Sequence, residues 1–249
     1  MNWVKEFYEK QYQLLKRDGE TSTITDYHKN LMLEIEELAG KPFQSMLELG
    51  AGGGEVAIVA AQKGYDVTTI ELVPALVEHM EKQAQKYESA GSLHAICGDF
   101  LQVDVSAAFD VICYIDGFGV GEDQDQIQLL KRIANWLHPD GCALVDIYTP
   151  WYWAKHAGQM MRFESFQRKY DYDFEQARML DTWFTESNTR YTQSLRCYAP
   201  ADLKRLLARS GLRLAEIVPG GAMNYETGQY TENVSLGEAM SYRVKLVKN

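Results

Sequence analysis

A glycine-rich turn between two short apolar runs is the sequence feature that most restricts how this chain can fold. The first run, residues 46–49, ends in Gly50-Ala-Gly-Gly-Gly54, and an alanine-rich stretch then leads to a second run that ends in Glu71. A strand that turns at once into a helix needs positive φ angles or close backbone approach, and glycine permits both without steric cost. Residues 43–71 are therefore predicted to form one strand–helix–strand unit with parallel strands.

The same unit carries the residue types of a nucleoside-binding site. N–H groups at a helix N-terminus face polar ligands, and an acid at the end of the next strand, Glu71, can accept two hydrogen bonds from a ribose. The spacing Gly50-x-Gly52-x-Gly54 differs from the Gly-x-Gly-x-x-Gly of dinucleotide-binding loops. Glu48 stands before the loop, where it would repel a pyrophosphate, so a ligand with positive charge is favoured. The alternative is a glycine turn that only packs a helix against a strand.

A second acid follows the next predicted strand, residues 93–97, in the sequence Gly98-Asp99-Phe100. An aspartate just beyond a strand can accept a hydrogen bond from the exocyclic amine of adenine, and an aromatic neighbour can lie against the ring. The alternative is an aspartate that only caps a turn or a helix.

The acid-x-Gly-x-Gly-x-Gly pattern resembles the first motif of the class I S-adenosylmethionine-dependent methyltransferases. The resemblance is specific over residues 43–148 and looser over residues 199–248. It implies S-adenosyl-L-methionine as the cofactor, bound near Glu48, Gly50, Gly52, Gly54, Glu71, Leu72, Asp99, Phe100 and the backbone of Ile115. It also implies that an N-terminal tyrosine, Tyr8 or Tyr12, closes over the methionine end of the cofactor.

Residues 2–40 are predicted to form two helices, because apolar and aromatic residues recur there at helical spacing. Gly40 and Pro42 are the stop signals of the second helix. Most of this apolar surface is expected to pack on the sheet. The surplus of aromatic residues near the start favours a cap over the cofactor.

A fourth strand over residues 109–115 ends in Asp116-Gly117, and a helix over residues 124–137 then leads to a fifth strand at residues 142–148. The Asp/Asn-Pro-Pro-aromatic motif of nucleobase and amide N-methyltransferases is absent after the fourth strand. The Leu-x-Pro-x-Gly of residues 137–141 is a further motif of the resembling family. Asp116 would lie near the reacting methyl group, and a simple turn is the alternative.

Beyond residue 149, period-two alternation over residues 161–172, 179–185 and 190–198 predicts an antiparallel insertion of about three strands. Ligands in open α/β sheets bind outside the carboxyl ends of the strands, so the insertion would form a wall of the acceptor site. The predicted substrate-binding residues are Trp151, Trp153 and Phe163. The alternative is that these aromatic side chains only seal the domain.

The chain ends with a helix from Pro200, a strand over residues 212–218 and a last strand over residues 239–247. Such a terminal hairpin matches the methyltransferase sheet, whereas a dehydrogenase would continue with parallel units. We expect a single α/β domain with a Rossmann-like, mostly parallel seven-stranded sheet and an antiparallel last strand. Its expected parts are a helical cap (1–42), a cofactor-binding core (43–148), an antiparallel β insertion (149–198), and a last helix with a terminal β-hairpin (199–249).

Charge and composition exclude several other classes of function. The formal net charge is −10 and no basic cluster exceeds two adjacent residues, which disfavours nucleic-acid binding. No apolar run could span a bilayer, so no membrane association and a cytoplasmic location are expected. The four cysteines form no Cys-x-x-Cys pair, and no metal site is expected. None of these patterns defines an oligomeric state.

The predicted function is methyl transfer from S-adenosylmethionine to a small-molecule acceptor, at O or N, by in-line displacement. Orientation of the reactants can supply roughly 7–11 kcal/mol of barrier lowering. A general base is needed only if the acceptor carries a proton that is costly to lose, and the candidates are His156, Asp116 and Tyr148. Two alternatives stay open: an NAD(P)-dependent Rossmann oxidoreductase, and a non-catalytic S-adenosylmethionine-binding module.

Overall fold

The computed structural model describes residues 2–17, 23–187 and 189–249. Residues 18–22, between the two predicted N-terminal helices, and residue 188, in the predicted insertion, lie outside the described part. The helices are α1 (Asn2–Arg17), α2 (Asp26–Ala39), α3 (Glu55–Gln62), α4 (Pro74–Ala84), α5 (Asp123–Trp136), α6 (Pro150–Lys155) and α7 (Pro200–Leu207).

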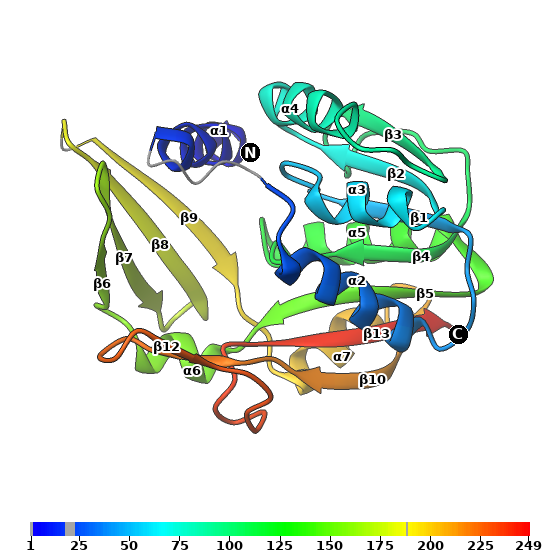
Figure 1. Ribbon diagram of the computed structural model, residues 1–249. Coiled ribbons are helices and arrows are strands. Elements are labelled where there is room, and N and C mark those ends of the chain that lie inside the picture. The colour runs from blue at the N-terminus through cyan, green and yellow to red at the C-terminus, as the bar shows by residue number, and fades with distance from the viewer. Residues whose placement is uncertain (1, 18–22, 188) are drawn as a thin grey trace.

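A seven-stranded sheet forms the centre of the molecule, with strand order β10-β13-β5-β4-β1-β2-β3 (Figure 1). Its strand β13 lies between β5 and β10 and is antiparallel to both, while the other neighbouring pairs are parallel. The mostly parallel sheet with a reversed last strand is therefore confirmed. The strands are β1 (Ser45–Leu49), β2 (Asp66–Glu71), β3 (Ser92–Cys97), β4 (Phe109–Tyr114), β5 (Leu137–Tyr148), β10 (Leu212–Pro219) and β13 (Ser241–Lys248).

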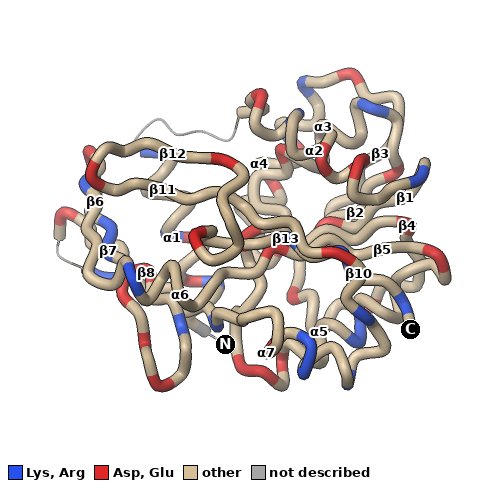
Figure 2. Tube along the Cα trace, turned by 90° about the horizontal axis from the view of Figure 1, so that it is seen from below, with Lys and Arg blue, Asp and Glu red and all other residues tan. Residues whose placement is uncertain are grey.

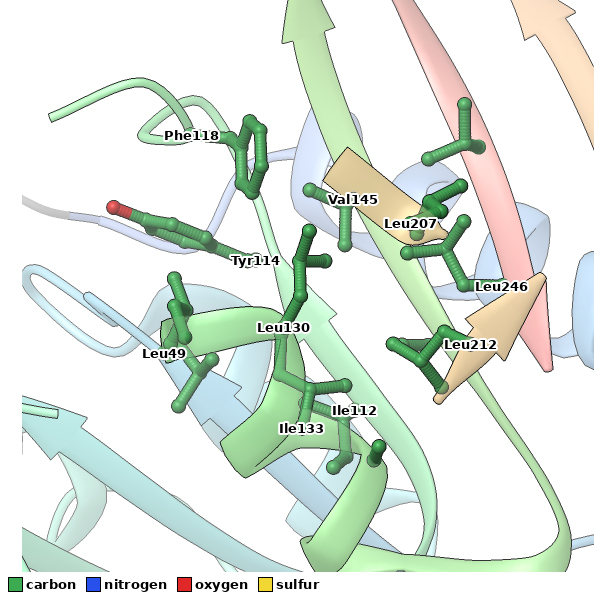
Figure 3. Packing of buried hydrophobic residues seen from close by; sticks show 14 of the residues in the cluster. Leu49, Ile112, Tyr114, Phe118, Leu130, Ile133, Val145, Leu207, Leu212 and Leu246 are labelled. Atoms are coloured by element: carbon green, nitrogen blue, oxygen red, sulfur yellow. The ribbon is translucent and has the colours of Figure 1, made fainter. Parts of the chain in front are cut away.

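Helices cover both faces of this sheet, and period-two alternation supplies an apolar layer to each. On β4, Val111 and Cys113 pack in the cluster with α2 and α3, whereas Ile112 packs in the cluster with α5 and α7. Figure 3 shows Leu130 and Ile133 of α5 close to Ile112 within the second cluster. Because both faces are buried, the central strands are almost wholly apolar.

The Leu-x-Pro-x-Gly motif, which precedes the predicted fifth strand, forms an irregularity inside β5. Phe109 pairs with Leu137 and Val111 pairs with Cys142, so residues 138–141 have no partner in this register. A single extended strand therefore holds the whole Leu-x-Pro-x-Gly motif.

The insertion is a separate sheet with strand order β6-β7-β8-β9. The first predicted strand, residues 161–172, is split in two because the chain turns back where the amide of Phe163 donates to the carbonyl of Phe166 at 3.0 Å. Residues 150–155, predicted as part of the insertion, form the short helix α6. The strands are β6 (Met160–Arg162), β7 (Phe166–Asp173), β8 (Arg178–Thr185) and β9 (Arg190–Arg196).

Between the predicted last two strands the chain forms a small hairpin of β11 (Ala222–Asn224) and β12 (Gln229–Thr231). The Asn224 side chain accepts hydrogen bonds from the amides of Glu226 and Thr227, and Gly228 has a φ of +70°. An Asn that bonds its own turn, followed by a glycine, is a hairpin signal that the sequence interpretation missed.

Positions of Lys and Arg are interspersed with positions of Asp and Glu along the Cα trace, as Figure 2 shows. None of the described helices combines the length and the apolar character that a bilayer crossing requires.

Candidate active site

A large pocket lies at the carboxyl ends of the parallel strands, where the strand order reverses between β1 and β4. Its volume is about 740 Å³, and its walls are the loops after β1, β2, β3 and β4 together with one side of α1. Ligands of open α/β sheets bind at such a point of reversal. The fold thus brings together residues that are up to about a hundred positions apart in the sequence.

The glycine loop forms the floor of the pocket. Gly50, Gly52 and Gly54 have φ angles of +62°, +57° and +81°, a region that favours glycine. A Cβ atom at Gly52 would meet no atom within 4 Å, so it would project into open space, whereas one at Gly54 would overlap Met80. Gly50 and Gly52 line the pocket, while Gly54 lies behind it and begins α3.

Glu71 stands at the end of β2 and is bound to the glycine loop. One carboxylate oxygen accepts the amide of Gly52 and the other accepts the amide of Val73, both at 2.9 Å. Burial raises the pKa of Glu71, and the backbone N–H donors oppose that shift. Each oxygen can accept a further hydrogen bond, so the carboxylate can also receive two ligand hydroxyls.

The predicted adenine contacts also line the pocket. Asp99 accepts the amide of Leu101 at 2.8 Å, which is a turn-capping bond, and its side chain lies at the pocket wall as well. Phe100 packs edge-on against Tyr114 with ring centroids 5.3 Å apart. Leu72 completes this end of the pocket.

Glu48 is placed differently from the sequence interpretation. It is buried at 5% exposure and is not among the residues that line the pocket. Burial raises its pKa to about 8, and one carboxyl oxygen has no hydrogen-bond partner in the described part of the chain. The side chain faces the α3 side of β1, beneath the loop, because alternate residues of a strand point to opposite faces.

The helix α1 supplies one wall of the pocket with Tyr8 and Tyr12, the two tyrosines predicted to cap the cofactor. Tyr8 is held from the insertion, where the side-chain amide of Gln193 donates to its hydroxyl at 2.6 Å. Tyr12 lies edge-on to His79 of α4. Lys5 also lines the pocket, and sequence reasoning missed it although it is three residues from Tyr8, on the same side of the helix.

Asp116 and Ile115 follow β4 and also line the pocket. Asp116 has a φ of +56°, uncommon for a residue other than glycine, and the Tyr148 hydroxyl donates to its carboxylate. The Asp116 side chain is exposed toward the pocket, and the protein atoms around the carboxyl group desolvate it in part and raise its pKa to about 6. Burial and the nearby Asp116 raise the pKa of Tyr148 well above its ordinary value, so its hydroxyl stays protonated.

The remaining predicted site residues do not line this pocket. Nδ1 of His156 lies 2.8 Å from the carbonyl of Tyr152, at the end of α6. The indole N–H groups of Trp151 and Trp153 donate to the carbonyls of Leu236 and Met240, at 3.0 Å each. Phe163 is stacked on Phe166 at 4.4 Å.

The inner face of the insertion carries a buried ion pair that sequence reasoning missed. Arg168 donates three hydrogen bonds to Asp181, at 2.7 to 3.0 Å, and the indole of Trp183 donates to the same carboxylate at 2.9 Å. The Asp181 side chain is fully buried. In the sequence, Arg168 and Asp181 are recognisable only as charged residues at inward-facing positions of the alternating runs 161–172 and 179–185.

No group of three or more metal-ligating side chains occurs among the residues that the structure describes.

The sheet with its reversed last strand, and a glycine loop joined to an acid at the end of β2, define a nucleoside-binding protein of the methyltransferase class.

The chain belongs to the methyltransferase-domain family, whose model matches residues 24–217. The predicted family and its cofactor, S-adenosylmethionine, are thereby confirmed. Over 109 residues the chain is 28% identical to the cypemycin N-terminal methyltransferase of a Streptomyces species. That match spans 43% of this chain and 43% of the relative, so less than half of the relative's length is covered.

Two solved structures share the fold. The CcbJ methyltransferase from Streptomyces caelestis has a TM-score of 0.71 at 18% identity, with 89% of each chain covered. An S-adenosylmethionine-dependent methyltransferase from Clostridium acetobutylicum also has a TM-score of 0.71, at 14% identity, with 97% of this chain and 98% of that chain covered. At these identities the likeness concerns the fold.

Proposed function

We propose that this protein transfers a methyl group from S-adenosylmethionine to a small-molecule acceptor. The observation that carries the proposal is the pocket at the strand-order reversal, with the open space above Gly52 at its floor and the Glu71 carboxylate beside it. Its volume of about 740 Å³ leaves room for the acceptor beside the cofactor.

The pocket residues fit the parts of this cofactor. Glu71 would bind the ribose hydroxyls, Asp99 and Phe100 the adenine, and the backbone of Gly50 and Gly52 the methionine portion. S-adenosylmethionine supplies a methyl group on a positively charged sulfonium, which needs no further activation. A lining with four carboxylates and one lysine suits a ligand with that charge.

The chain's own residues mainly orient the reactants and exclude water. Tyr8 covers the pocket from α1, and its bond to Gln193 holds this cover against the insertion. Asp116, supported by Tyr148, is the preferred candidate for contact with the acceptor, because it lies in the pocket and His156 does not. The relative's name, an N-terminal methyltransferase, is compatible with nitrogen as the acceptor atom.

Trp151, Trp153 and Phe163 would then act at a distance from the reacting atoms. The two tryptophans donate to the carbonyls of Leu236 and Met240, just before β13. Phe163 stacks on Phe166 within the insertion. We therefore assign the acceptor to the end of the pocket between Asp116 and Tyr8.

The test is calorimetry with S-adenosylmethionine and, separately, with NAD. We expect binding of the first ligand only. Replacing Glu71 by Ala removes two charge-assisted hydrogen bonds of about 1.5–3 kcal/mol each, so affinity should fall at least about tenfold. Glu81→Ala, an exposed glutamate on α4 outside the pocket, is the matched control.

Because Glu71 also holds the loop amides of Gly52 and Val73, melting curves of each variant must accompany the titrations. Glu71→Gln keeps the side-chain volume and covers the case in which the alanine variant does not fold. Tight NAD binding, or undiminished S-adenosylmethionine binding by folded Glu71 variants, would contradict the proposal.

A further inference from the structure

We infer that the acceptor is an amine that enters the pocket as its ammonium ion, with the Asp116 carboxylate as its counter-ion. The inference rests on the proposed function and narrows it from a small molecule in general to transfer onto nitrogen. Asp116 then has a specific task, recognition of the acceptor's charge.

The first ground is the geometry of Asp116. Asp116 lines the pocket, and its backbone is held at φ +56°, in the left-handed region. The Tyr148 hydroxyl donates a hydrogen bond to Oδ1 of Asp116, while Oδ2 has no hydrogen-bond partner within the described residues. The exposed Asp116 side chain thus offers the pocket a free carboxylate oxygen, which can accept a charge-assisted hydrogen bond from a ligand ammonium group.

Among the residues that the structure describes, no lysine or arginine forms an ion pair with Asp116, although Lys5 lines the same pocket. Arg168 is the cation whose charge acts on Asp116, but its guanidinium is bound by Asp181 through three hydrogen bonds. Asp146 and Asp181 add negative charge in the same region. Asp116 therefore faces the pocket as an uncompensated acid, and a ligand cation would neutralise it.

The surroundings of Asp116 are also suited to an ammonium group. Tyr8 also lines the pocket, near enough to Asp116 for the two groups to interact electrostatically, and the Tyr148 hydroxyl donates to the carboxylate itself. Burial raises the pKa of both tyrosines, so their rings stay neutral. Neutral aromatic rings attract cations by about 0.5–2 kcal/mol, whereas they offer a neutral hydroxyl no comparable gain.

The chemical step balances without a further co-reactant. One N–H proton of the bound ammonium passes to Asp116, whose raised pKa of about 6 makes the carboxylate a better proton acceptor than an ordinary aspartate. The freed nitrogen lone pair forms the new N–C bond as the methyl–sulfur bond breaks. The electron pair of that bond stays on sulfur, and the product is the N-methylated ammonium.

The experiment compares matched pairs of probes that differ in one group: benzylamine with benzyl alcohol, 2-phenylethylamine with 2-phenylethanol, and cyclohexylamine with cyclohexanol. Binding is measured by calorimetry in the presence of S-adenosylhomocysteine, so that the readout does not depend on turnover. We expect the amines to bind at least about tenfold more tightly than the alcohols. The preference should be lost in Asp116→Asn and kept in the matched control Asp104→Asn, an exposed aspartate outside the pocket.

Three results would overturn the inference: alcohols that bind as tightly as the amines, no binding by any amine, or an amine preference that survives in Asp116→Asn. The wild-type comparison needs no variant, so it decides the matter even if Asp116→Asn does not fold. Failure of S-adenosylmethionine to bind would instead overturn the proposed function, so the two failures are distinguishable.

Discussion

Glu48 is the residue whose behaviour follows most directly from its place in the fold. Its pKa of about 8 lies above the ordinary value of 4.5 because burial disfavours the carboxylate. Between these two values the folded protein keeps a proton that the unfolded chain loses, so stability must fall as the pH rises from about 4.5 to about 8. Below pH 4.5 Glu48 is protonated in both the folded and the unfolded state, so this loss of stability is absent.

We therefore expect Glu48→Gln, which cannot ionise, to be more stable than the wild type at pH 8 and to show a flatter pH dependence. Urea unfolding at pH 5 and pH 8 measures this difference directly. Glu81→Gln, at an exposed position, should leave the wild-type slope unchanged. Equal slopes for Glu48→Gln and the wild type would show that Glu48 is ionised in the folded protein.

Substitutions at Gly52 and Gly54 should distinguish an effect on cofactor binding from an effect on folding. Gly52→Ala places a methyl group in open space, so its cost to the folded protein is the left-handed backbone, about 1–2 kcal/mol. Gly54→Ala carries the same backbone cost and must also displace the fully buried Met80, and overpacking typically costs a further 1–3 kcal/mol or so.

We expect Gly52→Ala to lose most S-adenosylmethionine affinity with a modest fall in melting temperature, and Gly54→Ala to show the larger fall. Calorimetry and thermal melting on the same preparations give both quantities. If Gly52→Ala binds the cofactor as the wild type does, then the loop does not hold the methionine portion.

At the scale of elements, α1 joins the cofactor pocket to the insertion. Phe7 and Leu14 are buried against Phe166 of β7 and Trp183 of β8, while Tyr8 faces the pocket. The bond between Tyr8 and the buried Gln193 of β9 is the polar link in this contact. The position of the pocket cover thus depends on the insertion.

A double-mutant cycle tests this link. We expect Tyr8→Phe and Gln193→Ala each to weaken S-adenosylmethionine binding by about 0.5–1.5 kcal/mol, and the double variant to lose less than the sum. Calorimetric dissociation constants of the four proteins give the coupling. Strictly additive losses would mean that the hydrogen bond does not position α1 over the pocket.

At the scale of the whole molecule, α6 binds the insertion to the terminal hairpin. Trp153 is 2% exposed, donates to the carbonyl of Met240 and packs on Tyr148 and Tyr170. Truncation of such a core Trp typically costs about 3–5 kcal/mol. Trp151 is only half-buried, so its truncation should cost less.

We expect Trp153→Ala to lower the melting temperature strongly, Trp151→Ala less so, and both to retain S-adenosylmethionine affinity. Thermal melting and calorimetry distinguish this from a direct role at the acceptor. An unchanged melting temperature with a raised acceptor KM would show instead that these tryptophans contact the acceptor.

Local sequence sufficed for the parts of this protein that short-range chemistry controls. The strand–glycine loop–helix unit and the acid Glu71 follow from φ angles and strand ends, whereas the reversed last strand is what the resemblance to the methyltransferase family implies. The hairpin at β11 and β12 was equally local, but its signal, Asn224 with Gly228, was missed. In the glycine loop and in this hairpin, neighbouring residues alone define the backbone.

Tertiary structure decided which side chains face the pocket. Glu48 and Glu71 both lie near the carboxyl ends of parallel strands, yet one is buried beneath the loop and the other lines the cavity. Asp116 differs from a plain turn residue only through Tyr148, 32 positions away, and through Arg168 and Asp181 on another sheet. Sequence by itself therefore determined the family, the sheet and the cofactor, whereas the charge balance around Asp116 depended on contacts between distant strands, because burial and charge pairing exist only once the two sheets are packed together.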